Sequence, residues 1–281
     1  MKSELLVATN GFTGTWKAVE YGAWLAELMQ QKLILLGVAE NRSSAAIDEH
    51  HPLADIFAGA VDVFKQRGLE YELVIRNGEA EQVISEYANR GDYITVVSPL
   101  GRSWLRHWLT GRSFRALMEK ITGPLLHVPE MRLPLKKILI SAGGLGYEVS
   151  AENLALQIAT RSRAEVTILH VIPPTDMNYP TTSVTLEHVN DLQDTDTILG
   201  RSLRKGMEIA REANLDAQLT TRQGHVVEEI VAEVEQGNYD MVCMGSRYST
   251  HALRQLYTPN VTAEVAEAVH CPLLTVRHMP R

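Results

Sequence analysis

The sequence predicts an α/β protein made of two copies of one doubly wound domain, each with a five-stranded parallel sheet. Two observations predict this fold. Short apolar runs alternate with helical patterns along the chain, and the second half repeats the first in the same order. Strands that alternate with helices need crossover connections, which make neighbouring strands parallel. The length of 281 residues agrees with a duplication, because it corresponds to about two domains of ordinary size.

The internal repeat is clearest at the predicted strands. Five segments of the first copy align in order with five of the second: 5–11 with 138–144, 33–38 with 166–171, 76–78 with 222–224, 92–98 with 239–245, and 124–128 with 272–276. Residues 131–134 form a short linker, so we expect domains at 1–130 and 135–281. An insertion at about 173–200 in the second copy predicts a loop and then a long helix that ends near Ala213. Such a segment could cover the mouth of the second copy or contact a partner.

The elements of the first copy follow from two kinds of pattern. Strands are expected at 4–9, 32–38, 70–76, 92–97 and 124–128. These runs are rich in Val, Ile and Leu with little alternation, which is typical of strands that are covered on both faces. Apolar residues at helical spacing lie between them, as in Phe57, Ala60, Val61 and Phe64, in Phe114, Leu117, Met118 and Ile121, and in Val227, Ile230, Val231 and Val234 of the second copy. These stripes predict helices that bury one face against the sheet.

Composition excludes several classes of protein. The net charge of −7 argues against a generally basic nucleic-acid binder. We find no apolar run of membrane-spanning length and no signal peptide, so we expect a cytoplasmic protein with neither a membrane nor a nucleic-acid partner. Cys243 and Cys271 are the two cysteines, and they fit a reducing compartment as buried thiols. Cys243 is expected to end the fourth strand of its copy, and Cys271 to precede the fifth.

Topology indicates where a ligand would bind. Ligands of doubly wound sheets bind beyond the carboxyl ends of the strands, where the winding reverses. When a five-stranded sheet is wound outward in both directions from its first strand, that crevice lies between strands one and four. The turns after these two strands are therefore the places to look for chemistry.

The turn after strand four of the first copy carries a glycine and arginine pattern. It begins Ser98-Pro99-Leu100-Gly101-Arg102 and ends Gly111-Arg112-Ser113. Here the sequence resembles the universal stress protein family, whose nucleotide-binding members carry Gly-x2-Gly-x9-Gly-Ser/Thr after strand four. Gly101 and Gly111 stand at the second and third glycine positions, Ser98 replaces the first glycine, and Arg112 stands where the hydroxyl residue belongs, followed by Ser113. The resemblance extends over both copies and includes the Pro-Leu-Leu-x-Val ending of each.

The resemblance implies a tandem stress-response regulatory protein without turnover. Its two flavodoxin-like, or Rossmann-like, domains would pack as a pseudo-twofold pair through their last strands, and ATP, ADP or AMP would be the ligand, with Mg²⁺ as a candidate companion. Glycines let the backbone approach phosphates, the following helix presents its positive end, and arginine bonds phosphate bidentately. In family members that bind ATP an Asp usually follows strand one, where Asn10 stands here. The candidate site is Asn10, Ser98, Gly101, Arg102, Gly111, Arg112 and Ser113.

The second copy keeps less of this pattern. Gly143 stands at the position of the Asp, and Gly245 and Ser246 match the first glycine of the motif and its neighbour. Tyr248 occupies the second glycine position, and the third glycine is missing near Asn260. Gly143, Gly245, Ser246 and Asn260 therefore define a second, degenerate site.

Two other functions stay open. One is a protein-interaction module that binds no nucleotide. The other is an enzyme, because the segment that begins Ser141-Ala142-Gly143-Gly144 is similar to the Ser-Gly-Gly-x-Asp-Ser turn of ATP pyrophosphatases, although the Asp and the second Ser are absent. The adjacent His50 and His51 lack a recognised metal-ligand spacing, and no catalytic constellation stands out. A further homodimer also stays open.

Overall fold

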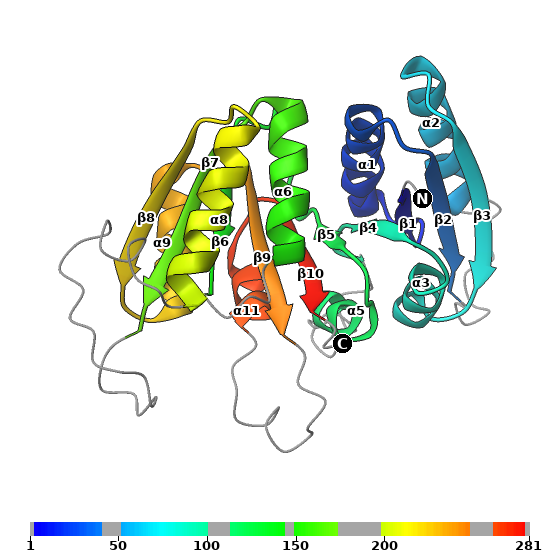
Figure 1. The fold of residues 1–281 in the computed structure, drawn as a ribbon. Coiled ribbons are helices and arrows are strands. Elements are labelled where there is room, and N and C mark those ends of the chain that lie inside the picture. The colour runs from blue at the N-terminus through cyan, green and yellow to red at the C-terminus, as the bar shows by residue number, and fades with distance from the viewer. Residues whose placement is uncertain are drawn as a thin grey trace. The chain divides into compact units, whose positions relative to one another are not determined.

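The computed structural model describes residues 3–40, 52–100, 113–143, 149–173, 198–247 and 261–278. The chain divides into two compact units, Met1–Met131 and Arg132–Arg281. In both units the described strands lie between helices (Figure 1).

Unit 1 contains five strands and four α-helices in its described part. They are β1 (Glu4–Thr9), a 3-10 turn η1 (Thr13–Thr15), α1 (Trp16–Met29), β2 (Leu33–Ala39), α2 (Pro52–Gln66), β3 (Tyr71–Asn77), α3 (Ala80–Ala88), β4 (Tyr93–Val97), α5 (Ser113–Lys120) and β5 (Leu125–His127). The strands are parallel and follow the order β3-β2-β1-β4-β5. Helix α1 packs against α2, and α3 packs against α5.

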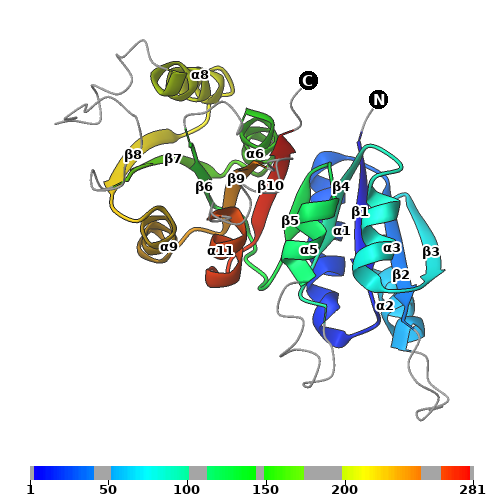
Figure 2. The same cartoon turned by 90° about the horizontal axis from the view of Figure 1, so that it is seen from below.

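Unit 2 repeats this order in its described part. Its elements are β6 (Lys137–Ser141), α6 (Val149–Ser162), β7 (Glu165–Ile172), α8 (Ile198–Glu212), β8 (Ala217–Gln223), α9 (Val226–Gly237), β9 (Met241–Arg247), α11 (Val261–Ala268) and β10 (Leu273–His278). The strands are parallel in the order β8-β7-β6-β9-β10. Figure 2 shows α6 and α8 on one face of this sheet and α9 and α11 on the other. The predicted doubly wound topology is confirmed in each unit.

The two sheets share one register as well as one order. In β1, Leu5 lies opposite Leu33 of β2, and the repeat-aligned Ile138 lies opposite Val166. The turn after the third strand is also shared, because Gly78 and Gly224 adopt φ of 144° and 155°. Each of these glycines donates its N–H to the second strand, at 3.2 Å to Ala39 and 3.1 Å to Ile172. Glycine is needed at this turn, since other residues rarely adopt such a φ.

Two expectations from the sequence are wrong. Cys243 lies inside β9, which continues to Arg247 because Ser246 and Arg247 still pair with β10. Strand β3 is not covered on both faces, since Val74 is its only buried residue. It is the last strand at its end of the sheet, and flanking helices cover such a strand less completely than a central one. The cysteines are buried and free as expected. Burial raises the pKa of the Cys243 thiol and raises that of Cys271 to about 12.

The contact between α1 and β1 leaves no room for a side chain at Gly22. A Cβ there would lie 2.3 Å from Cγ2 of Val7. We expect Gly22→Ala to lower the free energy of unfolding by about 1–3 kcal/mol, because overpacking outweighs the gain in helix propensity. Denaturant titration measures the loss.

Two companion variants test the cause of that loss. Adding Val7→Ala should make the double variant lose less than the sum of the single losses. Gly14→Ala should be nearly neutral, because its Cβ would meet only the Pro99 carbonyl oxygen at 4.0 Å. Additive losses in the double variant would show that the Val7 contact is not the cause.

Candidate functional site

The candidate site of unit 1 lies at the carboxyl ends of β1 and β4. Val7 lies opposite Val96 in the parallel ladder, so continuing the register places Thr9 beside Ser98. The turns that follow these two strands therefore converge, as the topology predicted. Of the seven candidate residues, Asn10 and Ser98 can be described in full, and Ser113 is the first residue of α5. Gly101, Arg102, Gly111 and Arg112 lie outside the described residues.

Asn10 is part of a polar chain that joins three elements. Its side chain is 5% exposed, and its Nδ2 donates to Oε2 of Glu40 at 3.3 Å. Oε1 of Glu40 accepts the backbone N–H of Ala80, the first residue of α3, at 3.2 Å. A carboxylate is favourable there, because the first N–H groups of a helix lack intrahelical partners. Sequence reasoning missed Glu40, whose one signal is its position directly after the second strand.

Hydroxyl groups hold the turn after β1 in place. Oγ1 of Thr9 and Oγ1 of Thr15 lie 2.6 Å apart, and both side chains are buried. The N–H of Gly11 donates to Oγ1 of Thr9 at 3.1 Å, and Gly11 adopts φ of 85°. The chain therefore bends at Gly11, as suits an Asn-Gly pair, and this bend keeps Asn10 at the end of β1.

Ser98 contributes a buried hydroxyl on the β4 side of the crevice. Its side chain is 2% exposed, and its Oγ has no hydrogen-bond partner within the described part of the chain. A buried polar atom without a partner is unfavourable by about 1–3 kcal/mol. Ser98 stands where the motif has its first glycine, and its Oγ is thus an unsatisfied polar atom at the crevice.

The corresponding edge of unit 2 has different chemistry. Gly143 is exposed, and a Cβ built there would meet nothing within 4 Å. The strand registers place Pro173 where unit 1 has Glu40, so the residue directly after β7 is not a carboxylate. Gly245 lies within β9, where its carbonyl oxygen accepts Oγ1 of Thr262 at 3.2 Å. Ser246 pairs with Arg277 through the backbone, and Asn260 falls outside the described residues.

A second residue that sequence reasoning missed is His127, at the end of β5. Its ring stacks on that of Phe114 in α5, with ring centres 4.4 Å apart. The side chain is 8% exposed, and Nδ1 has no hydrogen-bond partner among the residues that the structure describes. Burial therefore lowers the pKa of His127 to about 4, and the imidazole is neutral at pH 7. In unit 2 the repeat-aligned residues are Thr262 and Thr275.

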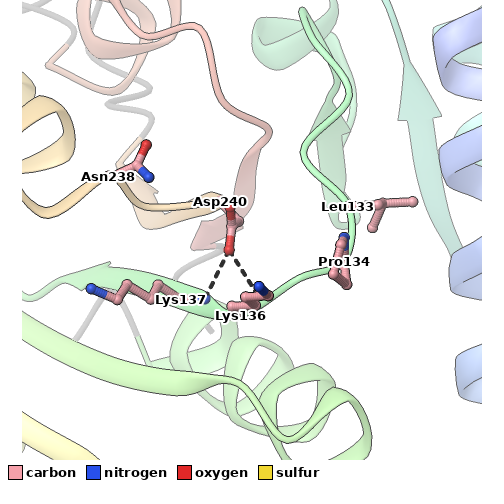
Figure 3. Close-up of a pocket in the computed structure, with 6 residues that line it drawn as sticks. All are labelled: Leu133, Pro134, Lys136, Lys137, Asn238 and Asp240. Atoms are coloured by element: carbon pink, nitrogen blue, oxygen red, sulfur yellow. Dashed lines mark hydrogen bonds between the residues drawn. The ribbon is translucent and has the colours of Figure 1, made fainter.

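A pocket in unit 2 lies at the amino ends of its strands, opposite the carboxyl ends, and is next to the start of β6. It is lined by Leu133, Pro134, Lys136, Lys137, Asn238 and Asp240 (Figure 3). Oδ2 of Asp240 accepts the backbone N–H groups of Lys136 at 2.8 Å and Lys137 at 3.0 Å. These bonds hold the start of β6 against the residue before β9, so the carboxylate has a structural role. The pocket is therefore separate from the candidate crevice.

Neither a metal centre nor a membrane span can be identified in the described part of the chain. Its His, Cys, Asp and Glu side chains form no group of three that could hold a metal ion. His50 and His51 lie outside that part. Of the helices described, none has both the length and the apolar character needed to cross a membrane.

Comparisons with known proteins identify the class to which this fold belongs. The model of the universal stress protein family matches the chain twice, over residues 1–129 and 134–277. The chain therefore belongs to the universal stress protein family. No curated protein sequence matches it.

Solved structures share the fold along almost the whole chain. A universal stress protein from Archaeoglobus fulgidus DSM 4304 aligns with a TM-score of 0.69 and 15% identity, covering 98% of this chain and 96% of that one. A functionally unknown protein from Pseudomonas aeruginosa PAO1 aligns with a TM-score of 0.68 and 14% identity, covering 98% and 92%. A family protein from Arabidopsis thaliana, solved with AMP bound, covers 51% of this chain and 92% of its own, with a TM-score of 0.34 and 14% identity.

The buried histidine makes stability depend on pH. Its pKa is lowered from 6.5 to about 4 in the folded state, so the unfolded state binds the proton first as the pH falls. The contribution of the neutral His127 to the free energy of unfolding is complete above pH 6.5. It is lost as the pH falls from 6.5 to 4. Between pH 7 and pH 5 the free energy of unfolding should fall by about 2 kcal/mol more in the native protein than in His127→Phe. Denaturant titrations at the two pH values measure this difference, and equal losses would show that His127 does not titrate in this way.

Proposed function

We propose that unit 1 binds an adenine nucleotide, ATP, ADP or AMP, at the carboxyl ends of β1 and β4. The protein would act as a stress-response regulatory protein whose output is binding rather than turnover. The proposed contacts are Asn10, Ser98, Gly101, Arg102, Gly111, Arg112 and Ser113, to which Glu40 is added. The proposal keeps 1–130 and 135–281 as the bounds of the two domains.

The observation that carries this proposal is the pair of polar groups where the turns of β1 and β4 converge. Asn10 is held by Glu40 at 3.3 Å, and the buried Ser98 Oγ has no partner within the described residues. Unit 2 lacks both features, since Gly143 and Gly245 stand at the aligned positions. A crevice at the switch point of a doubly wound sheet is also where such folds bind ligands.

The two ends of a nucleotide suit different parts of this crevice. Glu40 is an anion, so it would repel phosphates, whereas a carboxylate readily accepts hydrogen bonds from ribose hydroxyls. Arg102 and Arg112 are cations in the glycine-containing segment between β4 and α5, and arginine suits phosphate oxygens. We therefore orient the nucleoside toward Asn10 and Glu40, and the phosphates toward the segment that includes Gly101 and Gly111.

Thermal denaturation with ATP and Mg²⁺ tests for the site. A ligand at 100 times its Kd adds about 2.7 kcal/mol of stability, which raises the melting temperature measurably. We expect Gly101→Val to abolish this shift, because a side chain would block the approach of the backbone to phosphate. The matched control is Gly143→Val in unit 2, where a Cβ has open space and the shift should persist.

Analysis of the bound ligand completes this experiment. Freshly purified protein is denatured and its supernatant is searched for nucleotides by mass spectrometry. If no nucleotide co-purifies and no shift occurs, unit 1 has no such ligand and the protein-interaction module is favoured. Nucleotide turnover above a buffer control would instead favour an enzyme.

Calorimetry with adenosine, AMP and ATP tests the orientation. Glu40→Ala should lower the affinity for each of the three ligands by a similar factor of about tenfold, as expected for a lost hydrogen bond to a charged group. Arg112→Ala should lower the affinity for ATP far more than the affinity for adenosine, because adenosine has no phosphate. Glu79→Ala removes a neighbouring exposed carboxylate and serves as the control. If Glu40→Ala affected ATP alone, the proposed orientation would be reversed.

A further inference from the structure

Strand β3 is an apolar edge of the sheet in unit 1. Leu73 and Ile75 are 41% and 53% exposed, and they are the large exposed apolar side chains of the described residues. In the part of the chain that the structure describes, β3 pairs with β2 and with no other strand. Figure 2 shows it at the rim of its unit, beyond β2. An edge of this kind is a template for another strand, and proteins usually protect it with Lys, Pro or a bulge.

The backbone of β3 presents alternate residues to the outside. Leu33 donates its N–H to the carbonyl of Glu70 at 2.9 Å, and Gly78 donates to Ala39 at 3.2 Å, so the even-numbered residues face β2. Both backbone groups of a strand residue point to the same side and alternate along the strand. The odd-numbered residues therefore face outward. The guanidinium of Arg76 donates to the Ile75 carbonyl at 2.9 Å, a bond that strand pairing would replace.

We propose that two copies of the chain pair antiparallel through β3, with the twofold axis at Val74. Leu73 then lies opposite Ile75 of the second copy, Glu72 lies opposite Arg76, and Tyr71 lies opposite Asn77. All seven residues of the strand gain a partner, and the outward-facing residues form the hydrogen-bonded pairs of an antiparallel ladder. The contact is isologous, because each pair occurs twice by symmetry. It does not depend on nucleotide binding.

Charge complementarity, together with the pairing of all seven strand residues, selects this register. Glu72 and Arg76 are both exposed, and opposite charges that face each other across two strands stabilise their pairing. A shift of two residues in one direction places Glu72 opposite Val74 and Arg76 opposite Glu70, which lies before the strand, and leaves Asn77 without a partner in β3. A shift in the other direction places Arg76 opposite Val74 and Glu72 opposite Gly78, so no charge pair forms. Glu72 keeps its ion pair with Lys32, at 2.8 Å, and a carboxylate can accept bonds from both cations.

The equivalent strand of unit 2, β8, lacks the exposed apolar pair and the complementary charges. The proposed contact therefore uses β3 rather than β8. At the aligned positions, β8 has Leu219, half-buried, and Thr221 in place of the exposed apolar pair. Arg222 is already held at 2.6 Å by Glu229 and at 2.9 Å by Glu233. Symmetric pairing of β8 would place Gln218 opposite Arg222, so neither the apolar pair nor the charge pair would form.

Sedimentation equilibrium of the full chain tests the dimer. We expect the native protein to show twice the mass of one chain, and Arg76→Glu to show the mass of a monomer, because Glu72 would then face a second carboxylate. The double variant Glu72→Arg/Arg76→Glu exchanges the charges and should restore the dimer. Thr221→Lys on β8 is the control and should leave the dimer unchanged. A monomeric native protein, or an Arg76→Glu variant that stays dimeric, would overturn the proposal.

Crosslinking tests the register even if the double variant fails to fold. Val74 faces its own symmetry mate at a Cα separation of about 4.5 Å, which a disulfide can span. Val74→Cys should therefore form covalent dimers under mild oxidation. Leu73→Cys should not, because the two copies of Leu73 lie diagonally at about 7–8 Å. The native cysteines are buried and do not compete. Equal crosslinking of the two variants, or none by Val74→Cys, would contradict this register.

Discussion

The parallel register of β1 with its neighbours is the constraint on which the candidate site depends. Because β1 lies between β2 and β4 and runs parallel to both, the residues that follow these three strands lie at the same edge of the sheet. That edge brings Asn10, Glu40 and Ser98 to the same region, although they are far apart in sequence. A slip of one residue would turn every side chain of a strand to the opposite face. The buried runs of β1, such as Leu5 to Val7, strongly disfavour such a slip.

Duplication preserved the backbone and changed the side chains. Gly78 and Gly224 keep the same positive φ and the same hydrogen bond to the second strand, since the turn geometry requires them. Side chains at the carboxyl edge are free of that requirement. There Glu40 corresponds to Pro173, and the stacked pair Phe114 and His127 corresponds to two threonines. The framework is thus common to both units, and any difference in binding resides in the turns.

The outer edges of the two sheets have diverged in a similar way. Arg222 in β8 is held by two carboxylates from α9, whereas Arg76 in β3 bonds only to the carbonyl of its neighbour among the interactions described for it. An arginine held within its own unit stabilises that unit, and one at an exposed edge is available to another strand. The same aligned position can therefore serve stability in one copy and association in the other.

Much of the fold could be predicted from the sequence, because it rests on local and repeated signals. Apolar runs such as Leu33–Val38 and helical stripes such as Val227–Val234 report burial directly, and the repeat shows that one unit occurs twice. Strand ends were less certain, since the ladder of β9 continues past Cys243 through backbone pairing that leaves no apolar signal. The exposure of β3 was missed for a related reason. An apolar run indicates that a strand forms, but not whether a helix covers it.

The sequence by itself determined the fold class and the duplication, and it predicted the edge of the sheet where a ligand would bind. Only the tertiary structure decided which side chains meet at that edge. The bonds from Glu40 to Asn10 and Ala80, and the stacking of His127 on Phe114, join residues from different elements. Such contacts depend on the packing of helices against the sheet. Periodicity along the chain records which face of an element is buried, but not which residue of another element it will touch.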